Sequence, residues 1–164
     1  MSCKCNDGHS SCVCEVLRAI KDLQDEANRD DCRGCKDCLA EPLGDLAGAR
    51  DTADTRVFTL TLKDGSPFFA FFKPEDSHHH RHCDACVSIF FRVEEVFDNC
   101  CARLRVLKPT KDDKVVNLAD GCCIDLSKVC EVEDFEKTFS CITVDLNCFC
   151  AVQCIKDIDL DICD

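Results

Sequence analysis

The sequence contains no tryptophan and no tyrosine, and its aromatic residues are 11 phenylalanines. A phenylalanine ring buries apolar area but has no polar group to offer a partner. We therefore expect these rings to fill a core and not to form a surface on which a ligand stacks. No apolar run approaches the roughly 20 residues that a membrane-spanning helix requires, so the sequence predicts no membrane span.

Basic residues are scarce relative to acidic ones. The chain has 20 lysines and arginines against 32 aspartates and glutamates, which gives a formal net charge of −12. A chain of this charge repels the phosphates of nucleic acids and of anionic lipids. We expect neither nucleic acid nor a membrane as a partner.

Sequence patterns of catalysis are missing as well. There is no glycine-rich phosphate loop, no H-E-x-x-H helix and no serine elbow. A cysteine nucleophile needs a histidine base and a positive setting that lowers its pKa. All five histidines lie in two polar segments of a strongly acidic chain, so we expect no enzymatic activity.

Cysteine, by contrast, is abundant, with 19 residues in a chain of 164. This content is typical of disulfide scaffolds, which belong to oxidising compartments. Residues 1–9 are polar and lack the apolar run of a secretory signal. We therefore expect synthesis in a reducing cytosol and a chain that binds metal, does thiol chemistry or meets oxidants later. Because 19 is odd, at least one thiol has no partner within the chain.

The first third of the chain is predicted to hold one helix between two irregular segments. Residues 1–11 are expected to form a flexible, cysteine-bearing arm, and residues 30–55, rich in Gly, Pro and Asp, a cysteine-rich loop. Residues 12–29 are predicted to form an N-terminal amphipathic helix, which Ser11 is placed to cap. Apolar residues recur there at spacings of three and four, namely Val13, Val16, Leu17, Ile20, Leu23 and Ala27.

After residue 55 the apolar period changes to two, which is typical of strands. The turn at Asp64-Gly65 predicts a hairpin between residues 56–62 and 67–73. Further short strands are expected where apolar residues alternate, at 87–93, 101–107 and 142–146. Between them we expect a charged turn at 108–113 and a charged connection or short helix at 131–138.

These elements predict a mainly β fold. We expect an antiparallel β-sandwich or barrel-like domain over residues 56–155, preceded by the single helix. Residues 156–164 are expected to be an acidic C-terminal tail.

Two stretches have the composition of a metal site. Cys32, Cys35 and Cys38 form a C-x2-C-x2-C run, a spacing that suits structural zinc or an iron–sulfur cluster. A fourth ligand would come from the histidine-rich stretch at residues 78–86, which contains His82, Cys83 and Cys86. The alternatives are that the three cysteines form disulfides and that the histidine-rich stretch is a solvated loop that binds transition metals adventitiously.

Two pairs of cysteines are adjacent in the sequence, Cys100-Cys101 and Cys122-Cys123. Neighbouring side chains on a strand point to opposite faces. We therefore expect one thiol of each pair to face inward and the other outward. The outward thiol would find its partner on another molecule.

Three segments have an unusual content, order and spacing: SIFFRVE at residues 88–94, CCARLRVL at 100–107 and CITVDLNCFCAVQC at 141–154. Together with the opening Met-Ser-Cys and the Cys-Val-Cys at residues 12–14, they resemble the spore coat protein Y/Z family, to which the exosporium protein ExsY of spore-forming bacilli belongs. The metal-like stretches are not part of the resemblance, and they leave room for a metal role.

The resemblance implies a structural protein of the spore coat or exosporium, synthesised in the mother cell cytosol without a signal peptide. It implies self-assembly into a homo-oligomer, expected to be a hexamer, that extends into a hexagonal two-dimensional lattice cross-linked by intermolecular disulfides. Other spore coat proteins are the further partners that it implies. The alternative is a cytosolic zinc-binding, cysteine-rich module with Cys32, Cys35, Cys38, His82, Cys83 and Cys86 as ligands; otherwise no cofactor is expected.

Cysteines in mobile segments reach a second molecule with the least strain. The candidates for intermolecular disulfides are Cys3, Cys5, Cys12, Cys14, Cys32, Cys35, Cys38 and Cys163. Other cysteines lie in dense apolar sequence or in an adjacent pair, and we expect them to be intramolecular or core thiols. These are Cys100, Cys101, Cys141, Cys148, Cys150 and Cys154.

Overall fold

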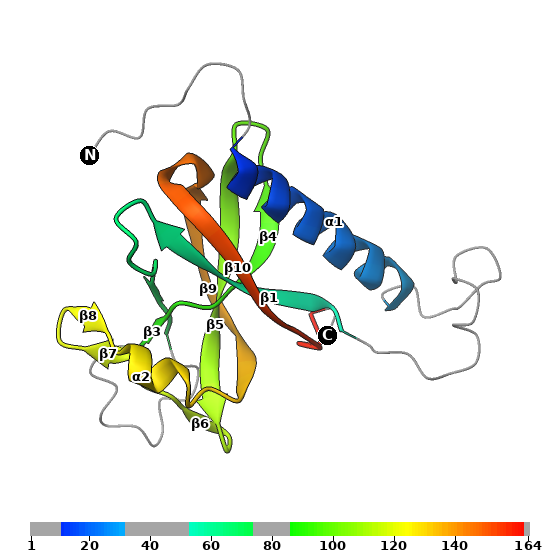
Figure 1. The fold of residues 1–164 in the computed structure, drawn as a ribbon. Coiled ribbons are helices and arrows are strands. Elements are labelled where there is room, and N and C mark those ends of the chain that lie inside the picture. Colours follow the sequence, from blue (N-terminus) through cyan, green and yellow to red (C-terminus); the bar gives the residue numbers. More distant parts are fainter. Residues whose placement is uncertain (1–10, 32–52, 74–85, 163–164) are drawn as a thin grey trace.

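The computed structural model describes residues 11–31, 53–73 and 86–162, which form one long helix and an antiparallel sheet (Figure 1). The elements are α1 (Cys12–Asp31), β1 (Thr55–Leu62), β2 (Ala70–Phe71), β3 (Val87–Ser88), β4 (Phe91–Val96), β5 (Cys101–Lys111), β6 (Lys114–Val115), β7 (Ala119–Asp120), β8 (Cys123–Ile124), α2 (Leu126–Val129), β9 (Asp134–Asp145), the 3-10 turn η2 (Leu146–Cys148) and β10 (Phe149–Ile158).

Helix α1 begins where the sequence supplies a cap. The backbone N–H of Cys14 donates to Ser11 Oγ at 3.1 Å, which satisfies one of the free amides of the first turn. The predicted N-terminal helix is confirmed, but its buried face is rotated from the expected apolar stripe. The buried residues are Val13, Cys14, Leu17, Ile20 and Gln24, whereas Leu23 of the expected stripe is 52% exposed.

The strands form one curled antiparallel sheet in the order β10-β1-β4-β5-β6, with β9 also paired to β5. Within the described part of the chain, β10 pairs with β1 alone, and β9 and the two-residue β6 each pair with β5 alone, so β9 and β10 are the two long outer strands of the sheet. The expectation of a mainly β, antiparallel fold with one N-terminal helix is confirmed.

Two apolar clusters form the core. The first lies where α1 packs on the sheet, and it joins Leu17 of the helix to Phe58, Phe91 and Leu104 of the strands. The second includes Leu107 and Leu118 and draws on β1, β5 and the last residues of β10. In Figure 1, α1 and the β7–β8 hairpin with α2 lie on well-separated sides of the sheet.

The segment after β1 departs from the predicted hairpin. Gly65, at a φ of +86°, completes the turn, and the Phe68 N–H donates to the Leu60 carbonyl at 2.8 Å. The chain then leaves β1, because β2 pairs with β3 instead. The predicted hairpin is therefore correct for the turn and for the first pairing, Thr61 opposite Pro67, and wrong for β2, which pairs with β3 and not with β1.

Two segments expected to be irregular are strand. Strand β5 continues through the expected turn at 108–113 and leaves only Asp112 and Asp113 in the connection, both at positive φ. Strand β9 begins inside the expected charged connection at 131–138. Lys108 of β5 lies opposite Glu136 of β9 and forms an ion pair with it. The charges that suggested a loop are thus matched across a ladder.

The folded domain extends past the expected boundary at residue 155. Strand β10 continues to Ile158, and both Ile158 and Leu160 are buried. The backbone N–H groups of Leu160 and Ile162 donate to the two oxygens of Asp54, at 3.0 and 2.9 Å. Residues 156–162 therefore belong to the domain and are not a tail.

Candidate functional site

The cysteines of the described chain divide into a buried pair and an exposed set. Cys14 of α1 and Cys100, in the turn between β4 and β5, form a disulfide with a Cα–Cα distance of 5.7 Å. Both are buried, with 0% and 8% of their side chains exposed. The expectation that Cys14 bonds a second molecule is wrong, because the rotation of α1 turns this residue into the core. Cys100 belongs to the set expected to bond within the chain.

Hydrogen bonds hold the β4–β5 turn against the helix. The Arg18 guanidinium donates to the carbonyls of Phe97 and Asp98, each at 3.3 Å. The Cys100 N–H donates to the Phe97 carbonyl, and Cys100 adopts a φ of +60°. This backbone directs Cys100 into the core and leaves the next residue, Cys101, half-buried on the other face. The adjacent pair is split as the strand alternation predicts.

Seven described cysteines have exposed side chains and no disulfide: Cys12, Cys122, Cys123, Cys130, Cys141, Cys150 and Cys154. Three of them lie on the outer strands of the sheet, Cys141 on β9 and the other two on β10. The expectation that Cys141, Cys150 and Cys154 are core or intramolecular thiols is wrong.

Alternation and edge position explain this exposure. Cys141 faces outward because side chains alternate along β9, and Ile142 and Val144, which have the opposite parity, face the core. Among the described strands, β10 has a neighbour on one side only, so its side chains are covered less than those of an inner strand. Cys150 and Cys154 are about 13 Å apart along this strand, and the Cys150 thiol donates to the Leu62 carbonyl at 3.2 Å. Cys148, in η2, is half-buried and disulfide-bonded.

The hairpin of β7 and β8 carries the other adjacent pair. Gly121, at a φ of +58°, turns the chain, and the Sγ atoms of Cys122 and Cys123 lie 3.3 Å apart. Both thiols are exposed, so the expected inward and outward split is wrong for this pair, which sits at a turn. The hydrogen bond with Cys122 and its charge, followed by burial and the charge of Asp120, raise the pKa of the Cys123 thiol.

The predicted metal ligands fall largely outside the described residues. Cys32, Cys35, Cys38, His82 and Cys83 lie there, as do the cross-link candidates Cys3, Cys5 and Cys163. Cys86 is half-buried against the first core cluster. In residues 11–31, 53–73 and 86–162, no three or more cysteine, histidine or acidic side chains are grouped to hold a metal ion. The zinc site stays a prediction.

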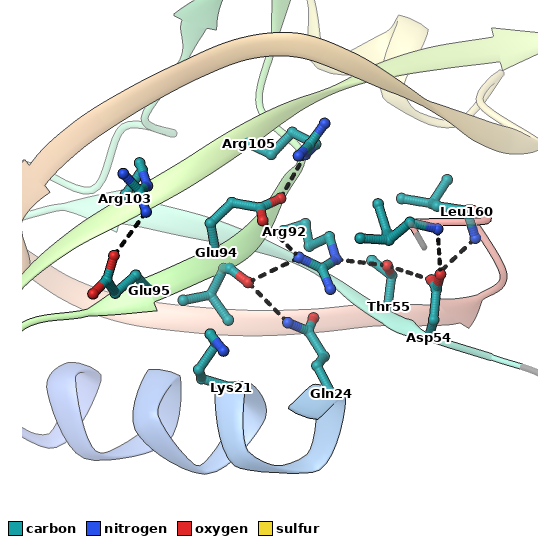
Figure 2. Close-up of polar contacts among 12 residues, drawn as sticks. Lys21, Gln24, Asp54, Thr55, Arg92, Glu94, Glu95, Arg103, Arg105 and Leu160 are labelled. Carbon is teal, nitrogen blue, oxygen red and sulfur yellow. Dashed lines mark hydrogen bonds and ion pairs between the residues drawn. The ribbon is translucent and has the colours of Figure 1, made fainter. Parts of the chain in front are cut away.

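A network of charged and polar side chains, which sequence reasoning missed, joins β1, β4 and β5 (Figure 2). Arg92 is only 3% exposed. Its Nε donates to Thr55 Oγ1 at 2.9 Å, and its guanidinium lies 3.0 Å from Glu94, which also pairs with Arg105. Burial raises the pKa of the Glu94 carboxyl, but the hydrogen bond from Arg105 and the charge of Arg92 outweigh it, so this pKa lies below its ordinary value.

Gln24 connects the helix to this network. Its Nε2 donates to the Val93 carbonyl at 2.8 Å, and its Oε1 accepts from the Arg56 N–H at 3.1 Å. A hollow of about 160 Å³ beside Gln24, between α1 and β1, is smaller than the roughly 300–1,000 Å³ of ordinary ligand pockets. The polar groups are therefore engaged in holding elements together.

Comparison with known proteins gives one consistent result. A family model described as spore coat protein Z matches residues 1–157. Spore coat protein Z of Bacillus subtilis (strain 168) is 31% identical over 148 residues, which cover 90% of this chain and 90% of that protein. No solved structure matches this chain.

Proposed function

This chain belongs to the spore coat protein Z family, and from that premise we propose that its structural role in the spore coat is to assemble with copies of itself into a sheet locked by intermolecular disulfides. The observation that carries the proposal is the placement of exposed thiols on both outer strands. Cys141 lies on β9, and Cys150 and Cys154 lie on β10.

The buried and the exposed cysteines have different roles in this proposal. The Cys14–Cys100 bond fixes α1 to the sheet within one molecule. Apart from the pair on the β7–β8 hairpin, the exposed thiols lie on the start of α1, after α2 and on the outer strands β9 and β10, so they face different neighbours. A flat array requires contacts in several directions, and thiols distributed in this way supply a bond for each.

We propose that the outer strands β9 and β10 make the non-covalent contacts by which copies of the chain first associate. An edge strand presents unpaired backbone N–H and C=O groups to a second chain. Contacts between copies at β9 and β10 would set the geometry while the thiols are reduced, with symmetric faces that close into a ring, which we propose is a hexamer. Oxidation of Cys141, Cys150 and Cys154 would then make the persistence of the sheet kinetic, because the copies could no longer dissociate.

Further aspects of this role are proposals on the same premise. We place the protein in the outer coat or exosporium, with other coat proteins as neighbours and without a catalytic role. In the residues that the structure describes, no helix is long and apolar enough to cross a membrane.

Electron microscopy of the purified full-length chain tests the proposal, with and without reductant and with and without a chelator. Ordered sheets that survive the chelator, and that dissociate in denaturant only when reductant is present, are expected. Monodisperse monomers under all redox conditions would overturn the assembly. Monomers that lose their structure in chelator would favour the zinc module instead.

Two sets of serine substitutions locate the cross-links. The triple variant at Cys141, Cys150 and Cys154 should still form rings, but its sheets should fall apart in boiling denaturant without reductant. The matched variant at Cys3, Cys5 and Cys12 removes the N-terminal thiols. If only the N-terminal variant loses resistance to denaturant, the cross-links lie there and the outer-strand assignment fails.

A further inference from the structure

The β7–β8 hairpin holds two thiols in a chelating arrangement that the assembly proposed above does not require. Cys122 and Cys123 are both exposed and free of disulfides, with their Sγ atoms 3.3 Å apart. The positive φ of Gly121 and the short β7–β8 ladder, Asp120 opposite Cys123, fix the turn that brings them together.

The separation of the Cys122 and Cys123 sulfurs matches the geometry of some bound centres better than that of others. With centre–sulfur bonds of about 2.3 Å, the length of zinc–thiolate bonds, two sulfurs 3.3 Å apart subtend an angle of about 92°. A tetrahedral ion would need the sulfurs about 3.8 Å apart. The hairpin therefore suits a pyramidal centre with bonds near a right angle.

The number of protein ligands at this hairpin limits further which metals or metalloids could bind there. The described residues place no third cysteine, histidine or acidic group with this pair as a metal site. A centre that brings its own third substituent needs no more than the two thiols. We propose that Cys122 and Cys123 chelate a thiophilic trivalent metalloid with one substituent of its own, the chemistry of a monosubstituted arsenic(III) compound.

The reaction needs no oxidant or reductant. For phenylarsine oxide, C6H5–As=O + 2 R–SH gives C6H5–As(S–R)2 + H2O. Two As–S bonds form while two S–H bonds and the As=O bond break, and both thiol protons leave with the oxide oxygen as water. Arsenic stays trivalent. The two thiols enter the net reaction protonated, so an acidic chain surface does not oppose it.

The second adjacent pair provides a control within the same molecule. Cys100 is buried and bonded to Cys14, whereas Cys101 is half-buried on the other face, so these neighbours cannot reach one centre in the folded chain. Trypsin separates the two pairs. Residues 115–128 contain Cys122 and Cys123 as their sole cysteines, and residues 93–103 contain Cys100 and Cys101 as theirs.

The test loads the intact, folded protein with phenylarsine oxide in excess 2-mercaptoethanol, which removes arsenic held by a single thiol. After trypsin digestion, mass spectrometry should find the phenylarsenic adduct on residues 115–128 and not on residues 93–103. Protein unfolded in urea before loading should carry the adduct on both peptides. Equal loading of both peptides in the folded protein, or none on residues 115–128, would overturn the proposal.

Single serine variants provide a second test of whether both thiols hold the arsenical. Cys122→Ser should reduce retention of the arsenical at residues 115–128 by roughly 10²–10⁴-fold, because a second thiol on the same turn acts at a high effective concentration. Cys130→Ser, which removes a nearby exposed thiol, should leave retention unchanged. Both positions are exposed, so circular dichroism should match that of the unmodified chain. Retention that survives Cys122→Ser contradicts two-thiol chelation.

Discussion

Removal of the Cys14–Cys100 disulfide tests how α1 is held on the sheet. The expected loss in free energy of unfolding follows from the length of the loop that the bond closes. The bond closes a loop with a sequence separation of 86 residues. Loop-closure entropy for that length is about 15 cal/mol/K, or about 4.6 kcal/mol at 25 °C. Alanine at both positions also removes two buried sulfur atoms, which adds roughly 1 kcal/mol. The double variant should therefore lose about 4–6 kcal/mol of its free energy of unfolding.

The measurement is urea denaturation at equilibrium, followed by circular dichroism. Alkylating the exposed thiols under native conditions first prevents disulfides between copies and keeps the Cys14–Cys100 bond from exchanging with free thiols. The same loss should lower Tm by roughly 10–20 °C in a domain of this size. Cys12→Ala, an exposed change in the same helical turn, is the matched control and should stay within about 0.5 kcal/mol. A double variant that differs from this control by less than about 1 kcal/mol would refute the reasoning.

Three further changes probe the core and the buried polar network. Phe91→Asp puts a charge at a fully buried position and should abolish folding, whereas Phe71→Asp, at a site 70% exposed, should give soluble folded protein; a soluble, folded Phe91→Asp chain on gel filtration would disprove the core assignment. Gln24→Ala should cost about 1–3 kcal/mol in urea denaturation, because the Arg56 N–H loses its bond to Gln24 and the Val93 carbonyl keeps only the longer bond from Arg92, while exposed Asp22→Ala should cost under about 0.5 kcal/mol. The folded-state pKa of Glu94 is lowered, so its ionised form stabilises the fold above about pH 4.5 and this contribution is lost as pH falls through the lowered pKa. Glu94→Gln should therefore be less stable than the unmodified chain at pH 7, and the difference should shrink towards pH 3; a constant difference would exclude titration of this carboxyl.

Helix α1 shows which features of the fold could be predicted from the sequence. Apolar spacing and Ser11 place α1 correctly, since both are local signals. The rotation of its buried face was missed because the expected apolar stripe did not include Cys14 and Gln24. Counting them with Leu17 gives the stripe that the structure buries. Their burial depends on a disulfide and on hydrogen bonds to strands far away in the chain, which no local period contains.

In the strands, too, local features could be predicted from the sequence and features that depend on distant contacts could not. Alternation predicts that Ile142 and Val144 face the core, and it also implies that Cys141 faces outward. The density of apolar residues around Cys141 outweighed that signal and led to the wrong expectation. The alternation of side chains does not predict that Cys154 is exposed, because its exposure follows from the position of β10 at the edge of the described sheet. Strand order is a property of the tertiary fold.

The two core clusters differ in their cysteine content, and this has a consequence for how the chain matures. Cys14 and Cys100 belong to the first cluster and Cys86 packs against it, whereas the described members of the second cluster include no cysteine. The core around Leu107 and Leu118 therefore contains no thiol that an oxidant could cross-link among its described members. The core beneath α1 gains the Cys14–Cys100 bond only when an oxidant is present. Oxidation should therefore raise the stability of the packing of α1 on the sheet and leave the second core unchanged.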